Sequence, residues 1–561
     1  MPVAALETRA SALRQGTQGG VGASVARFAP IAALVALAIA QQLRFGAFGD
    51  VSWMLTICEK WLGGGAPYVD FVETNPPAAI ALYLPATLVG HAVGVRPEAM
   101  VVAFGLLCGG AALGYAGTIL RAAGLTIGPQ SVALVAAVAA IAILPGRTFD
   151  ERDFFVALMV APVLALWCAR AVGFKIKLRD ALACGGLLGL AIAIKPPYGT
   201  IILAVVPYLW ARVGWRGLLN AAEFWTAGTL VVLYGAAVAV FFPAYVHDVI
   251  PTLAAAYVPV REPLAGLLSN PGTIGVIALL GVCVFLLREK ALEPVFIIPL
   301  LAALGALAAF FVQGKGWLYQ ALPAEMIATT LAGFTLQERA LSMRQLAAAA
   351  AAAGIVYALG ALQWSPPLPS ALLAAAFAHF ATAPRAEALD ARLNGVAEMA
   401  LATLVGALGA YFAMPFPGAD ETFAQTLRAL APHPTIAAIA PGLGTGFPLT
   451  RQVDGVWIMR RQGMLMTAGA RFLLSRHLGD VARLHAVIDE DKAAALADIV
   501  QERPDVILVS RINPAFHDWA LADPAVARTL EGYRLIASNR DLDWPVDLYA
   551  RADLIPLKSS Q

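Results

Sequence analysis

The chain has 561 residues, of which 59% are hydrophobic and only 14% are charged. Soluble domains carry about 25% charged residues, and a soluble fold of this size could not cover its surface with so few. The formal net charge of +2 provides no basic field for nucleic acid. The composition therefore excludes an ordinary soluble enzyme and a nucleic-acid-binding protein, and it predicts a polytopic α-helical membrane protein.

The apolar runs predict about 13 transmembrane helices, because each run is long enough to cross a bilayer. They follow a cytoplasmic tail of residues 1–27 and cover 28–45, 98–120, 129–145, 154–172, 180–195, 197–212, 222–242, 270–287, 292–312, 318–336, 345–362, 368–384 and 396–414. Arg27 and the Ala38-Ile39-Ala40 triplet also resemble a signal peptide, so cleavage within residues 1–40 stays open.

The run at 76–95 is interpreted as an interfacial helix, because Pro76, Pro77 and Pro85 interrupt it. The loops with most Lys and Arg then lie together, on the cytoplasmic side by the positive-inside rule. These residues include Arg121, Arg170, Lys175, Lys177, Arg179, Arg212, Arg216, Arg288, Lys290, Arg339 and Arg344. The transmembrane domain thus spans 28–415, and its loops 46–97 and 146–153 lie outside.

Residues 416–561 carry more charge and predict a soluble α/β domain on the outer side. Short apolar runs favour strands, and an amphipathic pattern favours a helix. The strands are expected at Thr435–Ala440, Val456–Met459, Val506–Val509, Leu535–Ala537 and Val546–Tyr549, and the helix at Asp489–Gln501. Gly442-x-Gly444-x-Gly446 is interpreted as a turn, because it lacks the context of a phosphate-binding loop.

Polar residues gather beside the outer ends of the spans, where charges are costly and usually mark function. They include Asp50, Tyr68, Asp70, Glu73, Arg147, Asp150, Glu151, Arg152, Asp153, Lys195, Lys315, Trp317 and Tyr319. Each has a structural alternative: Asp50 could cap a helix, and Lys195 could extend to the lipid headgroups. Their convergence on one face favours a site for an anionic substrate and a proton acceptor.

The order of these motifs resembles the GT-C glycosyltransferases that use polyprenyl-phosphate-linked sugars, including aminoarabinose transferases and protein O-mannosyltransferases. The resemblance covers about residues 28–415. Its motifs are Asp50, Gly65-x-Pro67-Tyr68-x-Asp70-x-x-Glu73-x-x-Pro76-Pro77, Phe149-x-x-Arg152-Asp153-x-Phe155, Ile194-Lys195-Pro196-Pro197 and Gln313-x-Lys315-Gly316-Trp317-x-Tyr319-x-x-Leu322-Pro323. Thirteen spans followed by an outer α/β domain is also the plan of the aminoarabinose transferases.

The resemblance implies an inverting transfer from a polyprenyl-phosphate sugar to a lipid, glycan or protein acceptor at the periplasmic face of a bacterial inner membrane. Asp50 would be the general base and Asp153 a second carboxylate. The substrate-binding group would be Arg152, Lys195 and Lys315 for the phosphate, Tyr68, Asp70 and Glu73 for the loop or sugar, and Trp317 and Tyr319 for stacking. The segment 243–269 would close over the substrates.

Metal dependence stays open at this stage. Many relatives have His where this chain has Gln320, no firm metal motif is present, and a divalent cation with a ligand such as His247 or Asp248 is one alternative. A membrane transporter or lipid flippase would also explain the spans, although the polar residues lie at one edge and no internal repeat is evident. A polysaccharide polymerase and a sensor are further alternatives.

Overall fold

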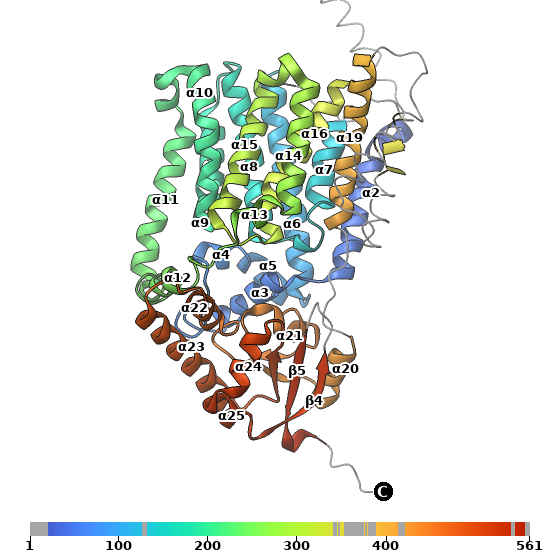
Figure 1. Cartoon of the computed structure of the whole chain (residues 1–561). Coiled ribbons are helices and arrows are strands. Elements are labelled where there is room, and N and C mark those ends of the chain that lie inside the picture. The colour runs from blue at the N-terminus through green and yellow to red at the C-terminus, as the bar shows by residue number, and fades with distance from the viewer. Residues whose placement is uncertain are drawn as a thin grey trace, which may run out of the picture.

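The computed structural model describes residues 21–125, 132–339, 389–412, 421–539 and 545–555, with a few single positions between 340 and 388. A helical bundle forms one half of the molecule, and a domain with a small sheet forms the other (Figure 1). The predicted tail 1–27 and the predicted spans 345–362 and 368–384 lie wholly or largely outside the described residues.

Apolar helices build the bundle in the order that the hydropathy pattern predicts. They are α2 (Val21–Phe45), α6 (Pro97–Ala122), α7 (Val132–Ala142), α8 (Arg152–Ala171), α9 (Leu178–Ile194), α10 (Thr200–Leu219), α11 (Ala222–Phe241), α14 (Pro271–Leu287), α15 (Pro294–Gln313), α16 (Leu318–Arg339) and α19 (Leu389–Phe412). Buried Leu, Ile, Val, Ala and Phe side chains fill the space between them. The polytopic helical membrane fold is therefore as expected.

The expected number of spans, thirteen, is not confirmed. Five helices of the described part are long and apolar enough to cross a membrane, and a sixth is counted if a bent pair is one span. That pair is Phe28–Arg44 and Gly49–Leu62, which meet at 74°. The bend directs α3 (Gly49–Leu62) away from the bundle axis, into the predicted loop 46–97.

Three helices from the predicted loop 46–97 lie between the bundle and the sheet domain (Figure 1). They are α3, α4 (Pro77–Ala81) and α5 (Leu84–Val93). Pro77 begins α4, and Gly94 ends α5 with a φ of 69°. A turn at residues 82–83 divides the run at 76–95 into these two short helices. Neither is long enough to cross a bilayer.

Five strands form the sheet of the C-terminal domain in the order β2-β1-β3-β5-β4. They are β1 (Thr435–Ile439), β2 (Val456–Trp457), β3 (Val506–Ser510), β4 (Tyr533–Asn539) and β5 (Val546–Arg551). β1 is parallel to β2 and β3, whereas β5 is antiparallel to both of its neighbours. Each strand matches a predicted apolar run. All five residues of β3 are buried.

The remaining helices cover the domain or connect its strands. They are α20 (Glu421–Leu430), α21 (Leu449–Gln452), α22 (Leu465–Ser475), α23 (Val481–Glu502), α24 (Pro514–Ala522) and α25 (Pro524–Leu530). Asp480 caps α23 and Asn513 caps α24 through their side chains. The glycine-rich run 442–446 forms a 3-10 turn at Leu443–Thr445.

Candidate active site

The helix α3 carries Asp50 in its first turn, where the helix dipole favours a negative charge. Its side chain is only 13% exposed, and Oδ1 lies 3.5 Å from Nη2 of Arg152. Asp50 thus faces the start of α8, a segment about a hundred residues away in the chain. The structure brings together the two groups that the sequence predicted for base and phosphate binding.

The predicted loop 146–153 ends earlier than expected, because Arg152 and Asp153 form the first turn of α8. Asp150 and Glu151 precede that turn, and all four side chains are buried. Burial raises the pKa of Asp150 well above its usual range, and burial together with the charge of Asp50 does so for Glu151. Burial therefore disfavours the charged form of both groups.

Asp153 is held by two partners from the next helical connection. Lys195 donates to Oδ2 at 2.7 Å, and the hydroxyl of Tyr198 donates to Oδ1. Lys195 also donates to Gln313 at 3.2 Å and lies 5.0 Å from the ring centre of Tyr319. Asp153 and Lys195 thus form a buried pair rather than two free groups, and Tyr319 is beside it.

Glu73 closes the side of the site formed by the first outer loop. It accepts hydrogen bonds from the indole of Trp53, from the backbone and side chain of Asn75, and from Thr74. Nη1 of Arg152 lies 3.9 Å from Oε1 of Glu73. Arg152 is therefore among three carboxylates, since Glu151 also lies 3.9 Å from its Nη2.

Tyr68 and Asp70 support the loop from positions that do not face Arg152 directly. The hydroxyl of Tyr68 donates to the carbonyl of Asn75 at 2.7 Å, and its ring packs 4.6 Å from Tyr245. Asp70 is exposed and accepts from the backbone N–H of Ala66 at 2.7 Å. Asp70 is thus separated from the buried cluster, and a turn explains its position.

Lys315 and Trp317 contact the segment predicted as a closing loop. Lys315 donates to the carbonyls of Tyr257 and Val260, and its Nζ lies 3.9 Å from the ring centre of Tyr257. Trp317 is 41% exposed and packs 5.7 Å from Tyr319. Lys315 therefore connects the segment between α15 and α16 to the segment 243–269. The sequence pattern did not predict this contact.

The segment 243–269 is more ordered than a simple loop. It contains a π-helical turn (Tyr245–Val249), α12 (Ile250–Ala256) and α13 (Leu264–Leu268). A cavity of about 230 Å³ lies between this segment, the first outer loop and the C-terminal domain. Its polar lining includes Thr74, Asp248, Arg460, Arg461 and Glu490.

Three contributors to the site were not selected from the sequence. Glu151 was noted as part of an acidic loop, but its complete burial was not evident. Tyr198 and Gln313 reach the Asp153–Lys195 pair through folding alone. The Lys-Pro-Pro-Tyr order was the available signal for Tyr198, because an aromatic hydroxyl follows the predicted lysine closely.

The described residues contain no group of three or more His, Cys, Asp or Glu side chains that could hold a metal ion. His247 and Asp248 are in the π-helical turn, and His247 is exposed.

Comparison with solved structures gives two matches to ArnT from Cupriavidus metallidurans. The structure bound to undecaprenyl phosphate has a TM-score of 0.57 and the apo structure 0.55, each at 16% sequence identity. Each comparison covers 96% of this chain and 100% of the ArnT chain. The chain has the ArnT fold. The ArnT-like architecture includes both the bundle and the sheet domain, as the resemblance to GT-C enzymes predicted.

No protein-family model matches the sequence, and neither does any curated protein sequence.

Proposed function

We propose that this protein is an integral membrane glycosyltransferase of the GT-C type. It moves a sugar from a polyprenyl-phosphate donor to a lipid, glycan or protein of the cell envelope. The observation that carries the proposal is the buried cluster in which Asp50, Glu73 and Arg152 meet beside the Asp153–Lys195 pair. The ArnT fold supports it, because one of the two matching ArnT structures holds undecaprenyl phosphate.

Arg152 is the group best suited to the phosphate of the donor. Within the described residues, its Nε and Nη1 atoms have no hydrogen-bond partner, although the side chain is buried. Unsatisfied buried donors are costly, and a phosphate oxygen would satisfy them with strong charge-assisted bonds. Lys195, which is close to Tyr319, adds a second positive charge on the same side.

Asp50 is the better of the two predicted carboxylates for the general base. Asp153 already accepts from Lys195 and Tyr198, whereas the polar contact of the Asp50 side chain within the described residues is the one to Arg152 at 3.5 Å. A base must reach the proton that it removes, and the partial exposure of Asp50 leaves room for an acceptor hydroxyl.

The proposed step is a single displacement with inversion. The acceptor oxygen forms a bond to the anomeric carbon while Asp50 takes its proton. The bond from that carbon to the phosphate oxygen breaks, and its electron pair remains on the polyprenyl phosphate. Arg152 and Lys195 stabilise the negative charge that develops on the leaving phosphate.

We propose the inner membrane of a bacterium as the location, with the cluster and the sheet domain in the periplasm. Arg121, Arg170 and Arg216 lie at the ends of α6, α8 and α10, with α8 beginning at the site and α6 beginning where Arg96 contacts the C-terminal domain. This charge distribution supports a cytoplasmic position for the opposite end of the bundle.

The test is sugar transfer by membranes that contain the Asp50→Asn variant. The substrate is the polyprenyl-phosphate-linked sugar fraction extracted from bacterial membranes, and mass spectrometry follows the acceptor. We expect a loss of about 10²- to 10⁴-fold in rate. Asp180→Asn is the matched control, because Asp180 is in the first turn of α9, at the far end of the bundle. Normal transfer by folded Asp50→Asn protein would exclude Asp50 as the base.

A further inference from the structure

The C-terminal domain contacts one face of α3 along the whole length of the helix. The contacting positions of α3 include Gly49, Trp53, Thr56 and Lys60, a spacing that places these four on one helical face. Their partners all come from residues 443–459, here called the docking segment. In order, the contacts are Gly49 to Leu443, Trp53 to Phe447, Thr56 to Arg451, and Lys60 to the carbonyl of Met459.

The docking segment fits closest at the end of α3 that carries Asp50. A Cβ atom at Gly49 would lie 2.7 Å from Leu443 Cδ1 and 3.3 Å from the carbonyl oxygen of Phe447. The rings of Trp53 and Phe447 are 5.5 Å apart. Asp50 follows Gly49 directly, so the segment is positioned to set the location of its backbone.

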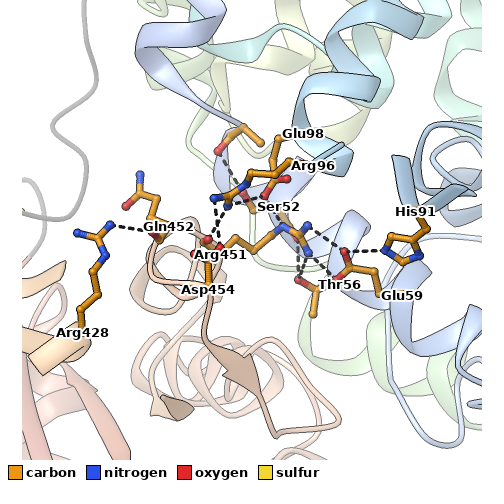
Figure 2. Close-up of polar contacts among 11 residues, drawn as sticks. Ser52, Thr56, Glu59, His91, Arg96, Glu98, Arg428, Arg451, Gln452 and Asp454 are labelled. Atoms are coloured by element: carbon orange, nitrogen blue, oxygen red, sulfur yellow. Dashed lines mark hydrogen bonds and ion pairs between the residues drawn. The ribbon is translucent and has the colours of Figure 1, made fainter. Parts of the chain in front are cut away.

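Arg451 is the charged centre of this interface (Figure 2). Its guanidinium donates to both oxygens of Glu59 in α3, at 2.7 and 3.0 Å, and to Glu98 in α6, at 2.7 Å. Only 11% of the side chain is exposed. One planar guanidinium group therefore connects α3 to α6. A lysine could not reproduce this, because its ammonium lacks the fixed, bidentate donor geometry.

The turn that carries Arg451 is itself held by the bundle (Figure 2). Arg96, directly before α6, donates to the carbonyl of Arg451 at 2.7 Å and pairs with Asp454 at 3.2 Å. Arg451 extends from the C-terminal domain to α3 and α6, whereas Arg96 extends from the start of α6 to the turn that carries Arg451. Together these contacts fix that turn relative to both helices.

The orientation of α3 affects the positions of two carboxylates near Arg152, those of Asp50 and Glu73. Asp50 is in its first turn, and Trp53, one turn later, donates to Glu73. The gap between Asp50 and Arg152 is 3.5 Å. A displacement of about 1 Å can lower a catalytic rate about 10²-fold, so a small rotation of α3 would be sufficient to misplace the base.

We propose that Arg451 is a positioning residue, through which the C-terminal domain fixes α3 and holds Asp50 at its working distance from Arg152. The proposal rests on the proposed function of Asp50. It gives the sheet domain a role in the reaction although Arg451 itself contacts no reacting atom.

The experiment compares Arg451→Met with the wild type, as full-length protein in lipid nanodiscs. We expect the kcat for sugar transfer to fall about 100-fold, while KM and the affinity for undecaprenyl phosphate each change by less than about 3-fold. Hydrogen–deuterium exchange should increase in Gly49–Leu62 and remain unchanged in β1 and β3. Arg528→Met is the matched control, because Arg528 is exposed in the same domain and donates to the carbonyl of Pro524 within its own helix, away from the docking segment.

A second variant protects the test against misfolding. Removing Arg451 leaves Glu59 and Glu98 without their shared partner, so Arg451→Met with Glu59→Gln and Glu98→Gln removes both carboxylate charges as well. We expect this triple variant to fold normally and to keep the low kcat. A wild-type kcat in either folded variant would overturn the proposal.

The outcome also separates this proposal from the proposed function. If the wild type transfers no sugar from the polyprenyl-phosphate fraction, the proposed function fails. Exchange in Gly49–Leu62 then decides the positioning of α3 alone: increased exchange in Arg451→Met supports it, and unchanged exchange overturns it.

Discussion

Nζ of Lys195 lies 2.7 Å from Oδ2 of Asp153, and both side chains are buried. The pair joins the C-terminal end of α9 to the first turn of α8. The hydroxyl of Tyr198 donates a hydrogen bond to the other carboxylate oxygen, Oδ1. This closed arrangement distinguishes Asp153 from Asp50, whose side chain is 13% exposed and lies 3.5 Å from Arg152.

Lys195→Met is expected to destabilise the protein by about 3–5 kcal/mol, because it leaves the carboxylate of Asp153 buried without its cation. Thermal and chemical unfolding in detergent would measure the change. The double variant with Asp153→Asn should recover at least half of the loss. Equal stability of the single variant and the wild type would show that the pair makes no net contribution.

Gly105→Ala is expected to disturb the turn before α8. A Cβ atom at Gly105 would clash with Oδ1 of Asp150, which is itself only 2% exposed. We expect a loss of about 1–3 kcal/mol in the free energy of unfolding and reduced transfer. Gly110→Ala in the same helix is the control, because a Cβ atom there meets nothing within 4 Å. Similar unfolding of both variants would contradict the expected clash.

Arg152→Gln is expected to weaken undecaprenyl phosphate binding about ten- to hundred-fold, because a hydrogen bond to a charged group contributes about 1.5–3 kcal/mol. Titration of the lipid into protein in nanodiscs would measure the dissociation constant. Arg216→Gln, at the far end of α10, changes the same residue type outside the cluster and should bind normally. Unchanged affinity in Arg152→Gln would remove the phosphate from this position.

The lowered pKa of Lys315 predicts a change in the free energy of unfolding at alkaline pH. Burial, with a smaller effect of Arg261, lowers the pKa of Lys315 to about 8 from the ordinary value of 10.5. Between these values the unfolded chain binds more protons than the folded chain, so the free energy of unfolding should rise with pH in this window.

The Lys315→Met variant should lack this component. Denaturation midpoints measured from pH 8 to 10.5 would then rise less steeply for the variant than for the wild type. Parallel curves would show that the amine of Lys315 is solvated in the folded protein.

Much of the architecture follows from local patterns. The apolar runs predicted most of the described bundle helices to within three residues and α2, α10 and α19 to within seven, because each must bury an apolar surface in lipid or protein. The short runs of the C-terminal domain became β1 to β5 for a similar reason, since apolar β-branched residues suit a buried sheet. Pro76, Pro77 and Pro85 predicted the interruption at 76–95.

The candidate site was predictable as a set of residues but less so as a geometry. Asp50, Glu73 and Arg152 meet as the convergence of outer-face charges suggested. Asp70 is exposed and Lys315 binds backbone carbonyls. Sequence spacing could not separate these two from the others, because the direction of a side chain in a loop depends on the contacts of that loop.

The sequence by itself determined the membrane class, the order of helices and strands, and the end of the bundle at which the polar groups gather. These properties arise from hydropathy and local backbone preferences. The tertiary structure alone decided which carboxylate is paired with Lys195 and which is left to Arg152. It also decided that Arg451, about 400 residues after Asp50 in the chain, would reach the same helix. Such contacts depend on how distant segments pack, and no local pattern records them.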